Sequence, residues 1–413
     1  MKKLIALFMI IIAFLPLIKG EEIAFTEYNK NPVFDPLLQP GEEIFPCVLY
    51  DANKFSGHGT SYQYKMWYGD TGGPNGTLKT AYSLDGINWS EQAISGLSSA
   101  ASHPVVVYDV NGFGEDIYYK MWYWDSIGTI SSIAAIRYAE STDGVTWIND
   151  QPIQQHAIDP SLQIIAGIGQ YNNYFYHLYG PAYVIYNPLG TNAGSGTPDN
   201  KNDDVVFTYK YVMYYDSSSE GTSPSQTNED TSLAYSSNGI YWIRHGDKPV
   251  LISSGNSNDW DGKYAFGASV VKVGNVYHLW YTGANGLGPD FYAQGIGHAT
   301  STDGINWVKD TNNPVFNAAD GIPWRSARTY SQWVVFEPNG FGSGKCPNIK
   351  MWFSGKSSST DAIEKVGYSH GCIISRNKNS LPLKKFIKIL KLDLNDGQAT
   401  GEIIKEGNAS ENT

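Results

Sequence analysis

The sequence predicts an all-β protein, a five-bladed β-propeller built from four-stranded antiparallel blades. Three observations support this fold class. The 413-residue chain is rich in residues typical of strands and turns, with 12 Trp, 29 Tyr, 16 Phe and 43 Gly. A short apolar and aromatic run occurs five times, and a Ser-x-Asp-Gly turn that ends in Trp, with Asn in place of Asp in one copy, follows four of these runs. Four-stranded units repeated around an axis make a β-propeller.

Each repeat unit is expected to contain a first strand, an aromatic second strand, a turn with a third strand, and an outer strand. The predicted first strands are Pro46–Tyr50, Pro104–Tyr108, Pro181–Tyr186, Ala268–Val273 and Gln332–Phe336. The predicted second strands are Tyr64–Tyr68, Tyr119–Tyr123, Tyr211–Tyr215, Tyr277–Tyr281 and Ile349–Phe353. The turns are Ser83–Trp89, Ser141–Trp147, Ser236–Trp242 and Ser301–Trp307.

The repeated turn has a structural interpretation and a functional one. Its Asp and Ser fit a metal or sugar ligand, but four copies in four blades cannot all face one axial site. We therefore expect Asp and Ser to bind the turn's own N–H groups, Gly to take a positive φ, and Trp to anchor the turn between blades.

The N-terminal segment is predicted to complete the last blade. Asn31–Phe34 repeats the pattern of Asn313–Phe316, which belongs to the outer strand of the fourth unit, and the fifth unit has no such copy. An N-terminal strand that closes the fifth blade removes a free sheet edge. A solenoid is the rival architecture, but its end units would be caps and not complementary halves.

The two ends of the chain differ from the repeats. Residues 1–20 have two early lysines and an apolar run over Leu4–Leu17, the pattern of a secretory signal. Cleavage is expected near Gly20, although Ile18 is a poor residue for the −3 position and an uncleaved anchor is the alternative. We expect a secreted or periplasmic protein without a spanning helix in the mature chain.

We divide the chain into residues 1–20, a propeller over 21–375, and a C-terminal segment over 376–413. In that last segment, apolar residues recur at helical spacing from Leu383 to Leu394, with lysines on other faces. Either a membrane-surface helix or an element packed on the flank of the domain fits this pattern.

Charge and cysteine content narrow the function. A net charge of −11 argues against nucleic-acid binding, which needs a basic surface. Three cysteines are too few for a disulfide scaffold and lack zinc spacing. If Met351 opposes Tyr368 across the second and third strands of the fifth unit, Cys346 falls almost opposite Cys372. We predict a disulfide between them in an oxidising compartment, with Cys47 buried and free.

Propeller ligands bind at one end of the axis, where the first strands begin and where the second strands lead into the third. The candidate ligand-binding residues there are His103, His177, Tyr179, Trp324, Arg325, Arg328 and Tyr330. The same geometry places Glu43, Phe45, Asp261 and Lys263 near this end, together with Asp70, Asp125, Asp216 and Lys356. For Asp70, Asp125 and Asp216 a role as turn caps is the simpler interpretation.

The five units resemble the five-bladed propeller glycosidases, which include the arabinanase and β-xylosidase, the invertase and levansucrase, and the mannoside phosphorylase families. This resemblance implies two acids at the starts of first strands, in Asp-Pro and Glu-Gly-Pro patterns, acting across a sugar. This chain instead has Phe45 before Pro46, His103 before Pro104, and Tyr179 where a general acid would stand.

Four carboxylates are the candidate catalytic residues. Asp35 and Asp159 each precede a Pro in loops that lead to the binding face, and Asp261 and Asp320 lie near that face. The first hypothesis is a secreted glycoside hydrolase that uses a pair of these acids. The second is a non-catalytic glycan-binding or interaction propeller that lacks the usual acids.

A third hypothesis, compatible with either, is an anionic ligand held by the basic residues of the face. We expect a carbohydrate or other small polar ligand, a monomer and no cofactor. A calcium ion in the axial channel fits the resemblance, but no ligand cluster in the sequence identifies one.

Overall fold

The computed structural model describes residues 23–35, 44–69, 78–114, 116–125, 135–155, 169–171, 174–193, 207–220, 227–245, 248–287, 295–358, 364–373, 394–395 and 398–399. The chain divides into two compact units, Met1–Ile373 and Ile374–Thr413. In the second unit, β24 (Leu394–Asn395) and β25 (Gln398–Ala399) form an antiparallel pair. The predicted secretory signal and the amphipathic residues before Leu394 lie outside the described residues.

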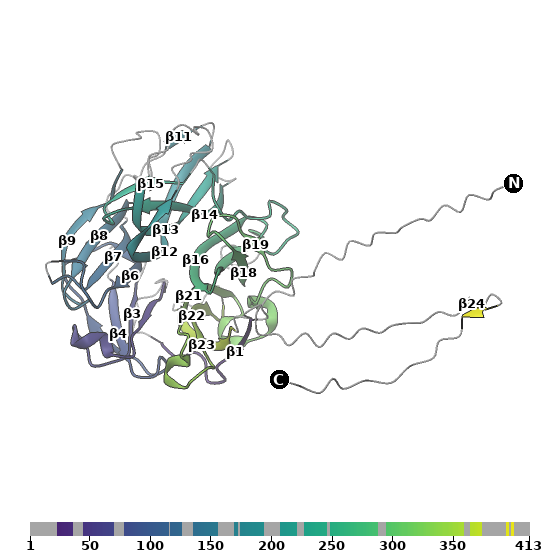
Figure 1. Cartoon of the computed structure of the whole chain (residues 1–413), viewed down its shortest axis with the longest axis horizontal. Helices are drawn as coiled ribbons and strands as arrows, with labels where there is room; N and C mark the ends of the chain where they lie inside the picture. Colours follow the sequence, from purple (N-terminus) through teal and green to yellow (C-terminus); the bar gives the residue numbers. More distant parts are fainter. Residues whose placement is uncertain are drawn as a thin grey trace, which may run out of the picture. The chain divides into compact units, whose positions relative to one another are not determined.

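The first unit is all-β, and its sheets lie side by side with β6, β12, β16 and β21 toward the middle (Figure 1). One antiparallel sheet has the strand order β2 (Cys47–Tyr50), β3 (Tyr64–Tyr68), β4 (Lys79–Ser83) and β5 (Ser90–Ala93). The next has the order β6 (Ala101–Tyr108), β7 (Tyr119–Asp125), β8 (Ala135–Ser141) and β9 (Trp147–Pro152). Both sheets follow the predicted order of strands within a unit.

A third four-stranded sheet combines the two ends of the first unit. Its order is β1 (Ala24–Glu27), β23 (Lys365–Cys372), β22 (Ile349–Lys356) and β21 (Arg328–Phe336). The N-terminal β1 therefore occupies the outer position of the last sheet. The residues after β1 also dock there, since Phe34 forms a β-bridge with Val366.

The remaining strands of the first unit belong to one eleven-stranded sheet. Its first part contains β10 (Gln154–Gln155), β11 (Gly169–Tyr171), β12 (Tyr174–Ala193), β13 (Phe207–Glu220), β14 (Thr227–Ser236) and β15 (Tyr241–Arg244). Its second part contains β16 (Tyr264–Val273), β17 (Val276–Ala284), β18 (Gly295–Ser301), β19 (Val308–Lys309) and β20 (Phe316–Asn317). A parallel pairing of only two residues, between β14 and β16, joins the two parts.

Short 3₁₀ turns lie between strands of the first unit. They are η1 (Lys54–Gly57), η3 (Ala318–Asp320), η4 (Pro323–Arg325) and η5 (Gly340–Gly342).

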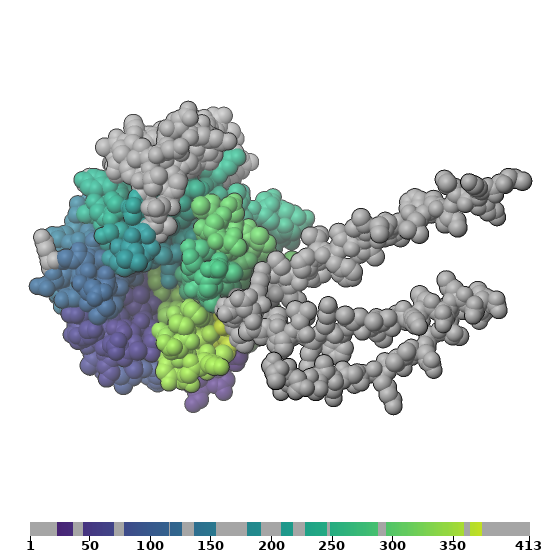
Figure 2. Space-filling view, in the orientation of Figure 1, coloured from purple at the N-terminus to yellow at the C-terminus, as the bar shows by residue number. Residues whose placement is uncertain are grey.

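The innermost strands contact one another in cyclic order. β2 lies against β6, β6 against β12, β12 against β16, β16 against β21, and β21 against β2. The space-filling view agrees, because N-terminal residues in purple border C-terminal residues in yellow-green (Figure 2). Each central strand is buried by the neighbouring sheets, and Met66, Trp67, Trp122, Met351 and Trp352 are fully buried.

The repeated turn is structural, as predicted for its Asp, Ser and Gly. In the first copy, Asp85 Oδ1 accepts the N–H groups of Ile87 and Asn88, and Ser83 Oγ accepts that of Gly86. Gly86 has a φ of 81°, a conformation that favours glycine. The motif's Trp also lies between units, as expected: the Trp89 ring meets the ring of Trp352 edge-on at 6.3 Å, although its Nε1 bonds no described residue.

An aromatic residue from the second strand of another repeat unit also bonds each turn. The hydrogen bonds run from Trp67 Nε1 to Gly144 O, from Trp122 Nε1 to Gly239 O, from Tyr214 Oη to Gly304 O, and from Trp352 Nε1 to Gly86 O. These bonds tie the first repeat unit to the second, the second to the third, the third to the fourth, and the fifth to the first.

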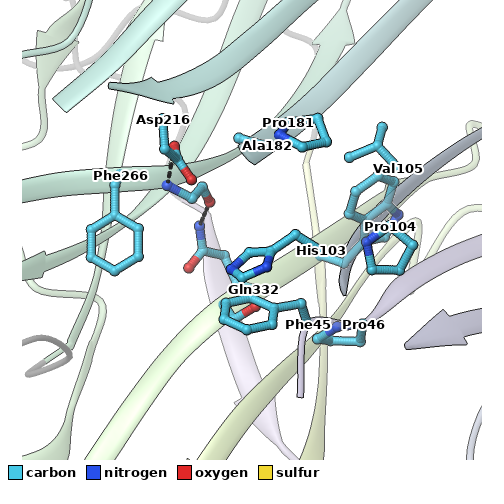
Figure 3. Close-up of a pocket in the computed structure, with 13 residues that line it drawn as sticks. Phe45, Pro46, His103, Pro104, Val105, Pro181, Ala182, Asp216, Phe266 and Gln332 are labelled. Atoms are coloured by element: carbon cyan, nitrogen blue, oxygen red, sulfur yellow. Dashed lines mark hydrogen bonds between the residues drawn. The ribbon is translucent and has the colours of Figure 1, made fainter. Parts of the chain in front are cut away.

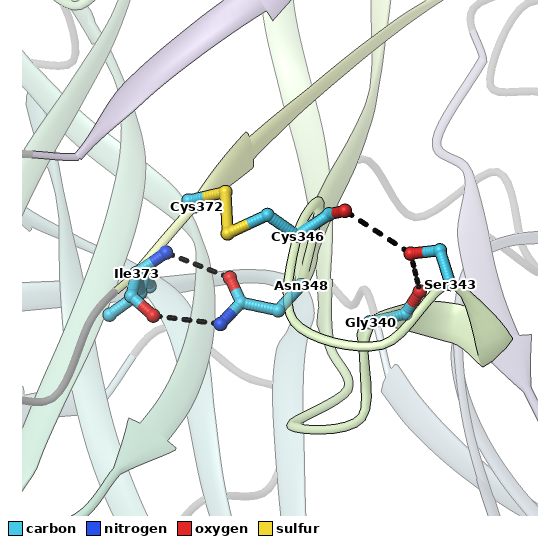
Figure 4. The surroundings of a disulfide bond; sticks show 6 residues. All are labelled: Gly340, Ser343, Cys346, Asn348, Cys372 and Ile373. Atoms are coloured by element: carbon cyan, nitrogen blue, oxygen red, sulfur yellow. Dashed lines mark hydrogen bonds between the residues drawn. A yellow bond between two sulfur atoms is a disulfide. The ribbon is translucent and has the colours of Figure 1, made fainter.

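Cys346 and Cys372 form a disulfide, with Cα atoms 5.6 Å apart (Figure 4). The strand register differs by one residue from the one expected, since Tyr368 lies opposite Trp352 and not opposite Met351. Asn348 bonds both backbone groups of Ile373 beside the disulfide, at 2.8 and 2.7 Å. Cys47 is a buried free thiol.

Candidate functional site

A hollow of about 400 Å³, counting the part open to solvent, lies where the starts of the innermost strands converge (Figure 3). Its walls come from Phe45, Pro46, His103, Pro104, Val105, Pro181, Ala182, Asp216, Phe266, Gly267, Ser331, Gln332 and Trp333. Residues far apart in sequence therefore share one site.

β-Bulges shape three of these walls. The register shifts between Ser102 and Val105 in β6, and equivalent shifts occur in β16 and β21. His103, Gly267 and Ser331 lie within these bulges with φ angles of 50°, 65° and 50°. Bulges beside binding sites redirect side chains, and a positive φ at a non-glycine residue is a strained conformation that often accompanies function.

Asp216 is the one carboxylate among the described residues that line the hollow. It lies in β13 and is 4% exposed. Its Oδ1 accepts the N–H of Gly267 at 2.8 Å, and Oδ2 has no hydrogen-bond partner among the described residues. Burial raises the pKa of Asp216 to about 7, although the Gly267 N–H favours the charged form.

The equivalent positions in other repeats show what Asp216 does for the fold. Thr282 in β17 accepts the Ser331 N–H through its hydroxyl, and Ser354 in β22 donates to the carbonyl of Ile44. These hydroxyls and Asp216 Oδ1 all bond the start of the next first strand. A neutral hydroxyl or amide can make this hydrogen bond. The fold therefore does not require an ionisable group at position 216.

His103 faces the same hollow from β6. Its ring stacks on Phe45 at a centroid distance of 3.4 Å and meets Trp124 edge-on at 5.4 Å. Ser102 Oγ lies 3.0 Å from its Nδ1. Burial lowers the pKa of His103 to about 3, so its ring is neutral at neutral pH.

The remaining wall is largely apolar, and its one amide is occupied. Gln332 donates to the carbonyls of Gly267 and Trp280, and it accepts the Thr282 hydroxyl. Its contacts hold the bulge that Asp216 also bonds (Figure 3). Asp216, His103 and Ser331 are thus the side chains of the described wall with polar atoms left to meet a ligand.

Three of the four carboxylates predicted as catalytic lie in ion pairs. Asp35 Oδ2 is 2.8 Å from Lys365 Nζ and more than half exposed. Asp261 Oδ2 accepts from Lys309 Nζ at 2.5 Å and from Tyr281 Oη at 2.9 Å. Asp320 Oδ2 lies 2.6 Å from Arg325 Nη2. The structure does not bring these three to the hollow, and Asp159 lies outside the described residues.

The predicted ligand-binding cluster near η4 instead holds the N-terminal strand. Arg325 is 2% exposed and pairs with Glu27 of β1 at 2.9 Å. Trp324 Nε1 donates to the same carboxylate at 3.2 Å. These two residues do not line the hollow, so they attach β1 to the domain.

Arg328 and Tyr330 form a second buried network beside the hollow. Arg328 Nη1 lies 2.8 Å from Glu364 Oε1, and Tyr330 Oη donates to Glu364 Oε2 at 2.6 Å. The arginines proposed for an anionic ligand therefore already have carboxylate partners. The backbones of His177 and Tyr179 belong to β12, and their side chains lie outside the described set.

No family model matches the chain, and no curated protein is significantly similar to it. Solved structures do match. A complex of BT0996 with RGII aligns over 85% of this chain and 92% of its own, with 14% identity and a TM-score of 0.57. A glycoside hydrolase aligns over 86% and 94%, also with 14% identity and a TM-score of 0.57. The chain has a glycosidase-like fold.

This glycosidase-like fold also occurs with a different chemistry. An N-acetylgalactosamine deacetylase from F. plautii, solved with blood group B trisaccharide, aligns over 85% of this chain and 94% of its own, with 16% identity and a TM-score of 0.50. The resemblance stated from the sequence is confirmed for the fold. A shared fold does not fix the reaction, which has to be argued from the site.

The described residues lack both a metal-ligand cluster and a membrane-spanning helix. They contain no group of three or more His, Cys, Asp and Glu side chains arranged to hold a metal ion. They also contain no helix that is long and apolar enough to cross a membrane.

From the sequence, Asp216 was only a candidate for the binding end, with a turn cap as the simpler interpretation. The signal was its alignment two residues after the central aromatic of the repeated run. The other copies have Gly69, Trp124, Thr282 and Ser354 at that position, so only one repeat carries an acid there.

Proposed function

We propose that the chain is a secreted, carbohydrate-active β-propeller of five four-stranded blades, whose site is the axial hollow. The cyclic contacts of the innermost strands support a closed ring. The hydrogen bond from Trp352 to Gly86 and the pairing of β1 with β23 support closure between the last blade and the first. In this arrangement, β12–β15 and β16–β20 are separate blades joined by the short β14–β16 pairing.

The reaction proposed is hydrolysis of a glycoside, with Asp216 as the proton donor. The observation that carries it is a single buried carboxyl at the wall of the hollow, with one oxygen left without a partner among the described residues. A general acid has to be protonated at the working pH, and burial places the pKa of Asp216 near 7.

A specific observation favours the alternative, a non-catalytic glycan-binding propeller. Glycosidases of the usual kind need two carboxyl groups across the sugar. The described wall offers one, and Phe45 and His103 stand where the resemblance implies acids. A stacked aromatic wall with a few polar groups is also suited to holding a sugar ring.

The N-terminal signal pattern and the Cys346–Cys372 disulfide support secretion, because such bonds persist in oxidising compartments.

Turnover of a panel of aryl glycosides separates the two functions. We expect the wild-type protein to cleave at least one, and Asp216→Asn to lower kcat by about 10²–10⁴-fold, the usual contribution of a general acid. The exposed Asp35→Asn variant is the matched control and should retain activity. If no glycoside is cleaved while the protein is retained on a glycan array, the binding module is the correct function.

A further inference from the structure

We propose that His103 is the proton acceptor that works with Asp216, so that an imidazole and a carboxyl replace the usual pair of acids. This inference rests on the proposed function and adds its second catalytic residue. Three features of the hollow support it: both side chains line it, the ring has a fixed orientation, and burial has opposite effects on the two groups.

Gly180 connects the two residues in space. In the ladder between β12 and β13, Gly180 lies directly opposite Asp216. A Cβ atom built on Gly180 would lie 3.5 Å from the Cβ of His103 and 3.3 Å from that of Trp124. Any side chain at Gly180, whose φ is 143°, would therefore contact His103, so the bare backbone there leaves room beside the ring.

The ring of His103 is held in one orientation. Phe45 covers one face of the ring, and Trp124 meets it at an interplanar angle of 89°. Ser102 Oγ is fully buried and lies 3.0 Å from Nδ1. When Nδ1 carries the proton and donates to Ser102, Nε2 keeps its lone pair, and the ring can accept a proton there.

Burial acts in opposite directions on the two groups. It raises the pKa of the Asp216 carboxyl to about 7 and lowers that of His103 to about 3. Two titratable groups whose pKa values are pushed apart in one site are suited to opposite roles as acid and base. Three charged groups on the neighbouring strands already have partners: Asp125 with Arg137, Glu364 with Arg328, and Asp230 with the Ser253 N–H.

The basicity of His103 suits this reaction. A catalytic carboxylate that activates water has an ordinary pKa near 4. A buried imidazole with a similar pKa accepts a proton about as readily, and it adds no negative charge next to Asp216. A second carboxylate there would raise the pKa of Asp216 further, and one of the two groups would stay protonated.

The proposed step is a single displacement. The oxygen of a water molecule forms a bond to the anomeric carbon while the bond from that carbon to the leaving oxygen breaks. His103 Nε2 takes a proton from the water, and Asp216 gives its proton to the leaving oxygen. The products are the free sugar and an alcohol, with His103 protonated and Asp216 ionised, and exchange with solvent restores both groups. The configuration at the anomeric carbon is inverted.

Chemical rescue tests this role. Because His103 has a φ of 50°, His103→Gly relieves backbone strain and leaves a space of imidazole size. With the glycoside identified for the wild-type protein, we expect His103→Gly to lower kcat by about 10²–10⁴-fold and to change KM little. Added imidazole should restore turnover in proportion to its concentration, whereas it should not rescue Asp216→Asn.

Two controls keep the outcomes distinct. His58→Gly removes a ring that stacks on Tyr118 away from the hollow, and it should neither lose activity nor respond to imidazole. On the wild-type protein, a ¹³C–¹H NMR titration should show the His103 ring neutral down to about pH 4, and Asp216→Asn should shift its signals. An active protein whose His103→Gly variant turns over normally overturns the inference and leaves the proposed function intact. Absence of turnover in the wild type overturns both.

Discussion

Asp216 makes a hydrogen bond that supports the fold, but its burial disfavours the ionised form of its carboxyl. Its Oδ1 holds the Gly267 N–H, a role that Thr282 performs with a hydroxyl toward the next bulge. The ionised form of Asp216 is therefore costly and the neutral form is not. This difference makes the stability of the protein depend on pH.

Asp216→Asn is expected to remove this dependence. The pKa of Asp216 is about 7 in the folded state and near 4 in the unfolded state, so the folded state binds the extra proton between these values. Wild-type stability should fall as pH rises from about 4 to about 7, by at most about 4 kcal/mol. The introduced amide oxygen can still accept the Gly267 N–H. The free energy of unfolding of the variant should therefore rise relative to that of the wild type as pH increases over this range. Thermal unfolding at pH 5 and at pH 8 measures the stability of the variant relative to the wild type. If this relative stability is the same at both pH values, burial does not disfavour the ionised form of Asp216.

Neighbouring positions explain why the sequence alone did not single out Asp216. Asp70, Asp125 and Asp216 all follow a second strand, but Asp125 lies three residues after its central aromatic and Asp216 only two. A shift of one residue places a side chain on the opposite face of a strand. Asp125 accordingly pairs with Arg137 at 3.5 Å, while Asp216 lines the hollow. Register, and not residue type, decides which acid reaches the site.

Among the structural elements, the N-terminal segment best shows how a repeat is completed. Asn313 bonds both backbone groups of His298, at 2.9 and 2.7 Å. Asn31 bonds those of Tyr368 in the same way, at 2.9 and 2.8 Å. The copied Asn-Pro pattern therefore predicted the docking of this segment. It did not predict β1, because Ala24–Glu27 is a short edge strand with no buried residue to give an apolar signal.

Asn31→Ala should weaken the attachment of the N-terminal segment. The substitution leaves the N–H of Tyr368 without its partner, at a cost of about 1–3 kcal/mol, while the Tyr368 carbonyl keeps the Tyr28 N–H. Urea unfolding should show a similar loss for Asn313→Ala, and the exposed Asn312→Ala serves as the control. Limited proteolysis should then cut near residue 30 faster in Asn31→Ala than in Asn313→Ala. Equal cutting rates in the two variants would show that Asn31 does not hold the segment.

For the whole molecule, the repeats predicted the sheets and the end at which their first strands converge. They did not predict which residues form the site there. The periodic aromatic runs record packing, which every repeat shares. The site depends on what differs between repeats: the acid at Asp216, the ring at His103 and the bare position at Gly180. A repeat pattern is defined by what the units share, so it does not indicate these three positions. The strand register of the structure shows that they lie around one hollow.

Ring closure is the property of the whole molecule that is most directly testable. Trp67 and Trp352 each donate to a glycine carbonyl of another sheet, at 2.9 and 2.7 Å, but the second bond joins residues 266 apart in sequence. In a closed ring, Trp67→Phe and Trp352→Phe should each cost about 1–3 kcal/mol, since each leaves a buried carbonyl without its donor. Trp89→Phe is the matched control, because its Nε1 bonds no described residue. Denaturant unfolding compares the three variants, and an open stack of sheets would make Trp352→Phe as mild as the control while Trp67→Phe stayed costly.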